Sequence, residues 1–565
     1  MKFFFKSVYV GRSSGTRVGK TLPPFLPLHP IWFALLILLL AACNAPDHPA
    51  SELRVFRYNQ HRSITSLDPA FARSQSNIWA VDHLYDGLLQ LDDSLRVRPA
   101  LAHSWDLSED GRTYTFYLRG DVRFHDDPVF PDSLGRPLRA SDVVYSFSRI
   151  IDPMVNSPGS WIFKDRIAAT QAFTAPDDST FVLRLREAFR PMLGILTMQY
   201  CAVVPREAVE TYGRDFRTRP VGTGPFRLKK WLEDQALFLL KNEHYFAREA
   251  DRALPLVDAV RVDFIPDRKT ALLELMKGRI DFMSGLESSY AGMLLTSEGD
   301  LRAAQREQLQ FLSAPFLNME YLGINMETVG DGPLSHQKVR QAMNFGIDRP
   351  RMLRRLRNSV GQAANSGFTP RGLPSFDAQK VPGYSYQPDR ARRLLAEAGF
   401  PNGEGLGEIE LLTSKDYLDL CTFITRQWED LGLKVKIELV ESAVLRGRMR
   451  KGQAPFFRAS WIADYPDAES FFTMFYSANP APPNYTHFRD SEFDRLYEAA
   501  LRENDDERRY ALYHRMDARL IELAPVIFLF YDESALIARR EVTGLSQNAI
   551  NLLNLRRVQK DRESQ

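Results

Sequence analysis

The side chains that could catalyse a reaction are not arranged in a recognised catalytic pattern. Beyond residue 42 the sequence contains neither Gly-x-Ser-x-Gly, which presents a serine nucleophile, nor His-Glu-x-x-His, which binds catalytic zinc. Ser460 and His487 are present, but no spacing ties either one to a base or a nucleophile. His125 lacks the fixed spacing of metal ligands, so residues 124–127 are interpreted as a surface turn. We expect no enzyme, metal or other cofactor, and an exported hydrolase is the least favoured alternative.

Cys43 is the nucleophile whose surroundings predict a definite reaction. It follows the apolar, uncharged segment 31–42, which is short for a transmembrane helix and is typical of the central part of a signal peptide. Five basic and no acidic residues precede that segment. Residues 40–43, Leu-Ala-Ala-Cys, are similar to the lipobox of bacterial lipoproteins, in which a diacylglyceryl group alkylates the thiol. Acyl chains, at about 0.8 kcal/mol per buried methylene, hold a domain on a membrane.

The sequence therefore predicts a lipoprotein signal peptide at 1–42, lipidation at Cys43 and a flexible tether at 43–51. The expected location is periplasmic or otherwise extracytoplasmic, with a lipid anchor in a cell membrane. Ordinary secretion with an unmodified cysteine is the alternative. The long basic region leaves open whether the true start lies further downstream, and the choice between inner and outer membrane is also open.

Composition places the remaining chain among ordinary multi-domain proteins. Without the five basic residues of segment 1–42, 68 Lys and Arg face 71 Asp and Glu, a net charge of −3 that gives no sign of nucleic-acid binding. The remaining 523 residues exceed what one core usually spans, so two or three domains are expected. Cys201 and Cys421 lie among apolar neighbours and are expected in cores, and whether they pair stays open.

Alternating short helices and strands predict α/β layers. Residues 105–118 alternate on both sides of a Ser-Glu-Asp-Gly turn, which predicts a β-hairpin. Residues 267–278 place apolar side chains on one helical face and end at a glycine suited to a helix C-cap. Asp389 is expected to cap another helix that Gly399 ends, and residues 433–439 alternate as a half-buried strand does.

A series of short motifs runs along the chain in a fixed order. The motifs lie at residues 66–70, 84–89, 101–105, 110–111, 114–119, 122–126, 140–143, 204–208, 220–226, 278–281, 339–342 and 347–349. Together they resemble the extracellular solute-binding proteins of the dipeptide, oligopeptide and nickel type (family 5), which serve ABC importers. Residues 127–139 are longer than the link expected in that family and are predicted to form a surface loop.

The resemblance implies an α/β, two-lobed fold of the periplasmic-binding-protein type (class II, peptide-binding), with an extra domain inserted in the first lobe. Ligand would lie between the lobes, and hinge closure would give the form that the permease recognises. The implied borders are residues 52–90, 202–318 and 527–565 for lobe I, 91–201 for the inserted extra domain and 319–526 for lobe II.

The resemblance also assigns a ligand site to residues 458–467, which are similar to the ligand-binding strand of oligopeptide-binding members. Asp464 would pair with the α-ammonium group of a short peptide through a charge-assisted hydrogen bond. Main-chain groups from Ala459 through Ser460 to Ile462 would bind the peptide backbone as an added strand, which gives affinity without reading side chains.

Two further residues are assigned with alternatives. Arg458 resembles the arginine that meets a peptide carboxylate in some members, and a structural ion pair is equally open. Trp461 could line a side-chain pocket or pack in a core, and Asp464 could instead be a turn residue that accepts local backbone hydrogen bonds. The predicted function is a peptide-binding lipoprotein of an ABC importer, and a receptor for a nickel chelate or saccharide is the alternative. Expected partners are the peptide, the permease and ATPase complex and the membrane, with a monomeric protein.

Overall fold

The computed structural model describes residues 53–286 and 288–560, so the predicted signal peptide, Cys43 and the tether lie outside the described residues. Within these residues no helix is long and apolar enough to cross a membrane. One mixed sheet of 11 strands has the order β17-β16-β18-β14-β19-β13-β1-β12-β9-β8, with β15 beside β19. Its strands are β1 Val55–Asn59, β8 Phe226–Leu232, β9 Ala236–Lys241, β12 Ala259–Asp263, β13 Phe282–Ser284, β14 Leu309–Ile324, β15 Gln362–Ala363, β16 Glu408–Thr413, β17 Lys434–Leu439, β18 Phe456–Ile462 and β19 Val526–Arg539.

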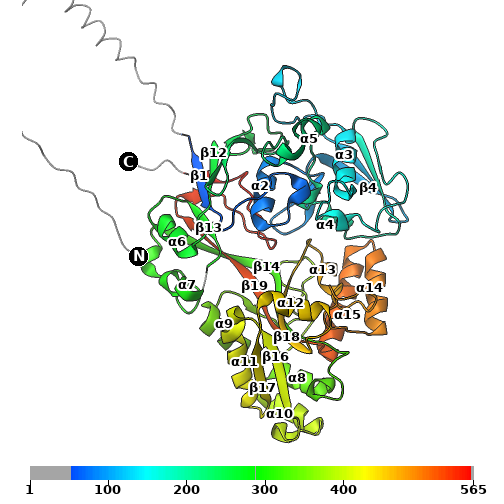
Figure 1. Cartoon of the computed structure of the whole chain (residues 1–565), viewed down its shortest axis with the longest axis vertical. Helices are drawn as coiled ribbons and strands as arrows, with labels where there is room; N and C mark the ends of the chain where they lie inside the picture. Colours follow the sequence, from blue (N-terminus) through cyan, green and yellow to red (C-terminus); the bar gives the residue numbers. More distant parts are fainter. Residues whose placement is uncertain (1–52, 287, 561–565) are drawn as a thin grey trace, which may run out of the picture. The chain divides into compact units, whose positions relative to one another are not determined.

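Strands β14 and β19 are the long members of this sheet and lie side by side in antiparallel register (Figure 1). Their pairing runs from Leu309 opposite Arg539 to Gly323 opposite Val526, with irregularities between Pro315 and Met319 and between Glu320 and Tyr321. One end of the pair, with Ile324 and Val526, belongs to one large hydrophobic core. At the other end, Leu536 of β19 belongs to a second large core and Leu309 of β14 to a smaller one. The lobe borders predicted from the sequence, 318/319 and 526/527, fall within these two strands.

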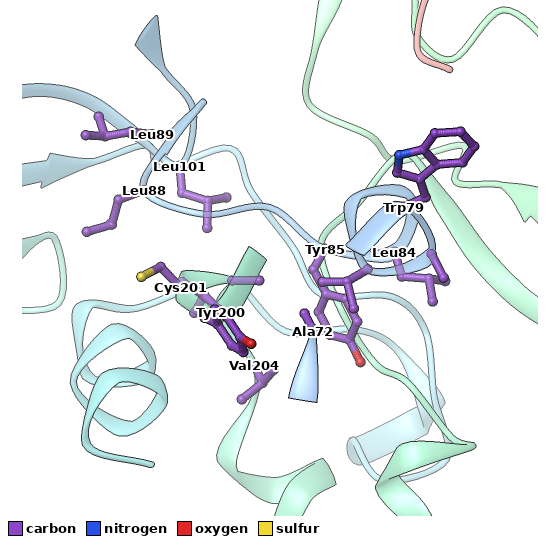
Figure 2. Close-up of a cluster of buried hydrophobic side chains, with 14 of the residues drawn as sticks. Ala72, Trp79, Leu84, Tyr85, Leu88, Leu89, Leu101, Tyr200, Cys201 and Val204 are labelled. Carbon is purple, nitrogen blue, oxygen red and sulfur yellow. The ribbon is translucent and has the colours of Figure 1, made fainter. Parts of the chain in front are cut away.

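Two large cores organise the described residues, and we use them to define the lobes. Lobe I is built around the first core, which includes Phe56 of β1 and Trp79 of helix α2 (Gln75–Leu84). Figure 2 shows part of this core, with Trp79 and Cys201 among its buried side chains. Lobe II is built around the second core, which includes Trp428 and Cys421. Cys201 and Cys421 are buried and free, so they do not pair with each other.

Residues 91–201 carry a separate antiparallel sheet of four strands but share the first core with lobe I. Its strands, in the order β4-β5-β7-β6, are β4 Ala102–Leu107, β5 Thr113–Leu118, β6 Phe173–Thr174 and β7 Thr180–Arg184. The predicted hairpin is confirmed, since Trp105 pairs with Phe116 and Leu107 with Tyr114. The remaining strands pair as β2 Leu89–Leu91 with β3 Val97–Pro99, β10 Arg248–Glu249 with β11 Arg252–Ala253, and β20 Val542–Thr543 with β21 Gln559–Lys560.

The helices of the described residues are α2 Gln75–Leu84, α3 Ala140–Ile151, α4 Met192–Ile195, α5 Arg206–Tyr212, α6 Arg268–Met276, α7 Ser288–Leu294, α8 Gln337–Phe345, α9 Arg349–Arg357, α10 Pro388–Glu397, α11 Leu418–Glu429, α12 Ser442–Arg450, α13 Glu469–Phe472, α14 Ser491–Arg502 and α15 Asp506–Leu523. Some of the helices, among them α2, α6, α9, α14 and α15, begin after a residue whose side chain caps the first turn. Helix α6 begins as predicted, with the Asp267 carboxylate accepting a hydrogen bond from the backbone of Thr270 at 2.7 Å.

Two local predictions are wrong. Helix α10 begins at Pro388 rather than after an Asp389 cap, because proline has the φ angle that the first helical position requires. Residues 124–127 do not form a simple surface turn, since His125 is buried and its Nε2 lies 3.0 Å from the carbonyl oxygen of Gly224. Burial lowers the pKa of His125 to about 4, so this imidazole is a neutral, structural group.

The predicted surface loop 127–139 is attached to the rest of the protein by one buried side chain and by ion pairs. Leu134 is 58% exposed, whereas Phe130 is buried. Arg136 forms ion pairs with Asp142 at 2.7 Å and with Glu207 at 2.6 Å. The loop therefore lies at the surface but is held against lobe I.

Candidate functional site

The candidate ligand strand β18 has a partner along one edge and an almost open second edge. It pairs with β14 over its whole length, from Ile462 opposite Asn318 to Phe456 opposite Ile324. On the other side, β16 reaches it only where Leu412 lies opposite Phe457. Within the described residues, the second edge of β18 from residue 458 to 462 therefore has no paired strand. An edge of this kind can accept an added peptide strand.

Asp464 lies just after β18 and is exposed. Its backbone N–H donates a hydrogen bond to the Ser470 hydroxyl at 3.1 Å, which fixes the chain at this point. Surrounding protein atoms still desolvate the carboxyl group and raise its pKa to about 6. Among the described residues no group donates a hydrogen bond to this carboxylate, so the local-turn alternative has no side-chain contact to support it.

The Asp464 carboxylate faces lobe I closely enough to influence Tyr200. Burial raises the pKa of Tyr200 to about 12, the positive charge of Arg73 opposes that rise and the negative charge of Asp464 adds to it. Tyr200 belongs to the short helix Gln199–Cys201 and lies in the first core (Figure 2). Asp464 thus lies where lobe II approaches lobe I.

The guanidinium group of Arg458 already contacts other groups of the protein. Its side chain is 8% exposed and forms a buried ion pair with Glu320 of β14. The ring of Tyr417, from the short helix Lys415–Tyr417, lies against the guanidinium group. Burial raises the pKa of Glu320, and the positive charge of Arg458 opposes that rise. This geometry matches the structural ion pair that the sequence left open for Arg458, and contact with a ligand carboxylate stays a prediction.

The other predicted site residues divide between the core and the open edge. Ala459 is buried and Ser460 is half-buried, whereas Ile462 is 54% exposed at the end of β18. The Trp461 ring packs against the second core, and its Nε1 donates a hydrogen bond to the Ser470 carbonyl oxygen at 2.6 Å. Ser470 therefore holds both Trp461 and Asp464, a positioning role that no sequence motif indicated.

A cavity of about 500 Å³ lies next to the β14–β19 pair and is lined from both lobes. Asp464 is not in its lining, which includes His61, Arg268, Arg357, Tyr417, Asp532 and Glu533. Arg357 forms an ion pair with Asp532 at 2.5 Å. Desolvation, together with the charges of Arg268 and Arg62, lowers the pKa of His61 to about 4. Sequence reasoning missed this cavity, because its residues come from segments that are far apart along the chain.

The described residues thus form a two-lobed α/β fold in which Asp464 and the unpaired edge of β18 belong to lobe II, and Asp464 faces Tyr200 of lobe I. The family model described as "Bacterial extracellular solute-binding proteins, family 5 Middle" matches residues 96–482. The chain belongs to this family of bacterial extracellular solute-binding proteins. The predicted family, the predicted fold class and the assignment as a binding protein rather than an enzyme are confirmed.

Several characterised relatives and solved structures match most of the chain. Heme-binding protein A of Haemophilus influenzae is 27% identical over 522 residues, covering 87% of this chain and 91% of that protein. The dipeptide-binding protein of Escherichia coli is 26% identical over 483 residues, covering 82% and 86%. HbpA2 from Haemophilus parasuis has a TM-score of 0.79 at 23% identity, covering 90% of this chain and 100% of that structure. DppA from Helicobacter pylori, in complex with the peptide STSA, has a TM-score of 0.68 at 26% identity, covering 90% and 98%.

Proposed function

We propose that the protein captures short peptides between its two lobes and delivers them to the permease of an ABC importer. The observation that carries the proposal is Asp464, an ionisable carboxylate just after a strand whose second edge is unpaired from residue 458 to 462. A peptide has a chemical group for each of these features. Its α-ammonium group would pair with Asp464, and its backbone would extend the sheet along residues 459–462.

The length of the open edge limits the number of peptide residues that can pair with it. Four residues of strand span roughly 13 Å at about 3.3 Å per residue, which suits a peptide of a few residues. Ile462 and Trp461 would contact side chains of the ligand, whereas Arg458 would support the strand through its pair with Glu320. The domain borders predicted from the sequence, with an inserted domain at 91–201 between parts of lobe I and with lobe II at 319–526, form part of the same proposal.

Calorimetric titration with di-, tri- and tetra-alanine tests this function. We expect saturable binding of at least one of these peptides, and a peptide of the same length with an acetylated amino terminus is the control. Binding of neither form, together with a non-peptide molecule found by mass spectrometry in the purified protein, would contradict the proposal. A non-peptide solute is the second candidate, since one relative is named a heme-binding protein and the cavity beside β14 and β19 is lined by charged groups.

The lipid anchor is a separate part of the proposal. Cys43 ends a lipobox-like sequence, and acylation there would hold the binding protein at the membrane that carries its permease. Cells fed a labelled fatty acid are expected to transfer label to the wild-type protein and not to a Cys43→Ser variant. Cys201→Ser is the matched control, because that thiol is buried and free. Equal labelling of the wild-type protein and of Cys43→Ser would contradict an anchor at this residue.

A further inference from the structure

The two lobes touch at a second place, away from the β14–β19 pair. Leu95 lies at the tip of the β2–β3 hairpin in the amino-terminal part of the chain, yet it is 3% exposed and belongs to the core of lobe II. Tyr465 of lobe II is 5% exposed and belongs to the core of lobe I. Each lobe therefore receives one side chain from the other.

The backbone of Leu95 indicates that leucine is present for this contact and not for the turn. Its φ of 58° is in the left-handed region, which glycine and asparagine favour and bulky residues avoid. The turn itself is held by Asp92, whose carboxylate accepts hydrogen bonds from the backbones of Ser94 at 3.0 Å and Arg96 at 2.9 Å. A leucine in this conformation is accounted for by the apolar surface that it buries in lobe II.

Tyr465 is fixed at both ends. Its hydroxyl group donates a hydrogen bond to Glu469, a buried carboxylate of lobe II that also accepts one from Tyr497. Its ring stacks on Trp161 with a centroid distance of 6.3 Å and an interplanar angle of 27°. Lobe II thus holds the polar end of Tyr465, and lobe I holds the aromatic ring.

Further contacts join the same two surfaces. The backbone N–H of Arg190, before α4, donates a hydrogen bond to the carbonyl oxygen of Leu501 in α14 at 3.2 Å. The Arg190 guanidinium lies 3.8 Å from the carboxylate of Asp506. Gly194 faces Pro466, because a Cβ atom at Gly194 would lie 3.6 Å from the proline ring. A cavity of about 470 Å³ between the same surfaces is lined by Leu95 and Arg190 on one side and by Pro466 on the other.

We propose that Leu95 and Tyr465 form a latch, a reciprocal exchange of side chains that holds the lobes together outside the hinge strands and couples ligand capture to closure. The coupling rests on the proposed function, since Tyr465 directly follows Asp464 in the chain. A ligand that draws Asp464 into place also draws the ring of Tyr465 into lobe I. Ligand affinity then falls as the latched fraction of the protein falls.

Hydrogen–deuterium exchange of the ligand-free protein tests the latch without any knowledge of the ligand. In Leu95→Asn the hairpin should stay folded, because asparagine accepts the left-handed conformation, while the apolar contact is lost. We expect exchange to become about tenfold faster in residues 464–472 of lobe II and at Arg190, as expected if the ratio of latched to unlatched protein falls about tenfold. The control is Leu134→Asn, which replaces an exposed leucine and should change neither segment.

Substitution of Tyr465 tests the latch from the other lobe, without changing the β2–β3 hairpin. Tyr465→Ser should speed exchange in residues 161–163 and 190–195 of lobe I, whereas Tyr465→Phe, which keeps the ring, should have a smaller effect. Faster exchange confined to residues 89–99 in Leu95→Asn, or to residues 464–472 in Tyr465→Ser, would overturn the latch. Calorimetry then tests the coupling, since peptide affinity in Leu95→Asn should fall by the same factor as the latched fraction. If the wild-type protein binds no peptide, the proposed function fails while the exchange data still decide the latch.

Discussion

Replacing Asp464 by asparagine is expected to weaken the binding of peptides that have a free amino terminus by about a hundredfold or more. The α-ammonium group of the ligand loses its carboxylate partner inside a closing site, and breaking a buried charge pair costs about 3–5 kcal/mol. The neutral amide keeps the size of the side chain and its polarity, so the backbone hydrogen bond to Ser470 should persist. Calorimetric titration of both proteins with the same tripeptide gives the ratio of Kd values directly.

The same carboxylate predicts how peptide affinity depends on pH. Its pKa is about 6 in the ligand-free protein, raised by desolvation, and a bound ammonium group would lower it. Affinity should therefore be constant between about pH 6 and the pKa of the peptide's α-amino group, about 8, and fall as the pH drops below 6, because binding then requires Asp464 to lose a proton. The fall should approach tenfold per pH unit, about 1.4 kcal/mol, until the pKa of the complex is reached. Asp464→Asn should remove this dependence.

Two controls distinguish the loss of the contact between Asp464 and the ligand's ammonium group from a nonspecific effect of the substitution on the protein. Glu429→Gln neutralises an exposed carboxylate of α11 and should leave peptide affinity unchanged. A peptide with an acetylated amino terminus should bind the wild-type protein as weakly as the free peptide binds Asp464→Asn. If Asp464→Asn keeps wild-type affinity for free peptides, the ammonium site lies elsewhere and the peptide assignment loses its main support.

The fold was predictable where local pattern and tertiary structure agree. The β4–β5 hairpin follows from strict alternation about a turn, and α6 follows from an apolar face with an aspartate before it. The motif series predicted the family, because many weak signals in one order are jointly specific. The start of α10 was missed by a residue or two, where Pro388 rather than Asp389 fixes the first turn.

The sequence could not show contacts between residues that are far apart along the chain, because these contacts depend on how distant segments pair and pack. Arg458 and Glu320 meet because β14 and β18 pair in one particular register, although 138 residues separate them. His125 was predicted on the surface, yet it is buried against Gly224, 99 residues away. The insertion of Leu95 into the core of lobe II is likewise invisible in a hairpin whose local sequence gives no reason to bury its tip.

Replacing Arg458 by methionine is expected to destabilise the protein by about 3–5 kcal/mol, because Glu320 would stay buried without its cation. The loss should be larger at pH 8 than at pH 5. Burial already raises the pKa of Glu320, and removing Arg458 raises it further, so protonation at low pH relieves the cost of an unpaired charge. Urea unfolding of both proteins at the two pH values measures these differences.

The double variant Glu320→Gln, Arg458→Met decides between a structural and a ligand-binding role for Arg458. A buried ion pair replaced on both sides is often neutral for stability, so the double variant should recover most of what Arg458→Met loses. If the pair only supports β18, the double variant should also bind peptides with wild-type affinity. If Arg458 instead meets the carboxylate of the ligand, the folded double variant should bind free peptides at least tenfold more weakly and lose the distinction between a free and an amidated carboxyl terminus. We expect the first result, because the guanidinium is already enclosed by Glu320 and the ring of Tyr417.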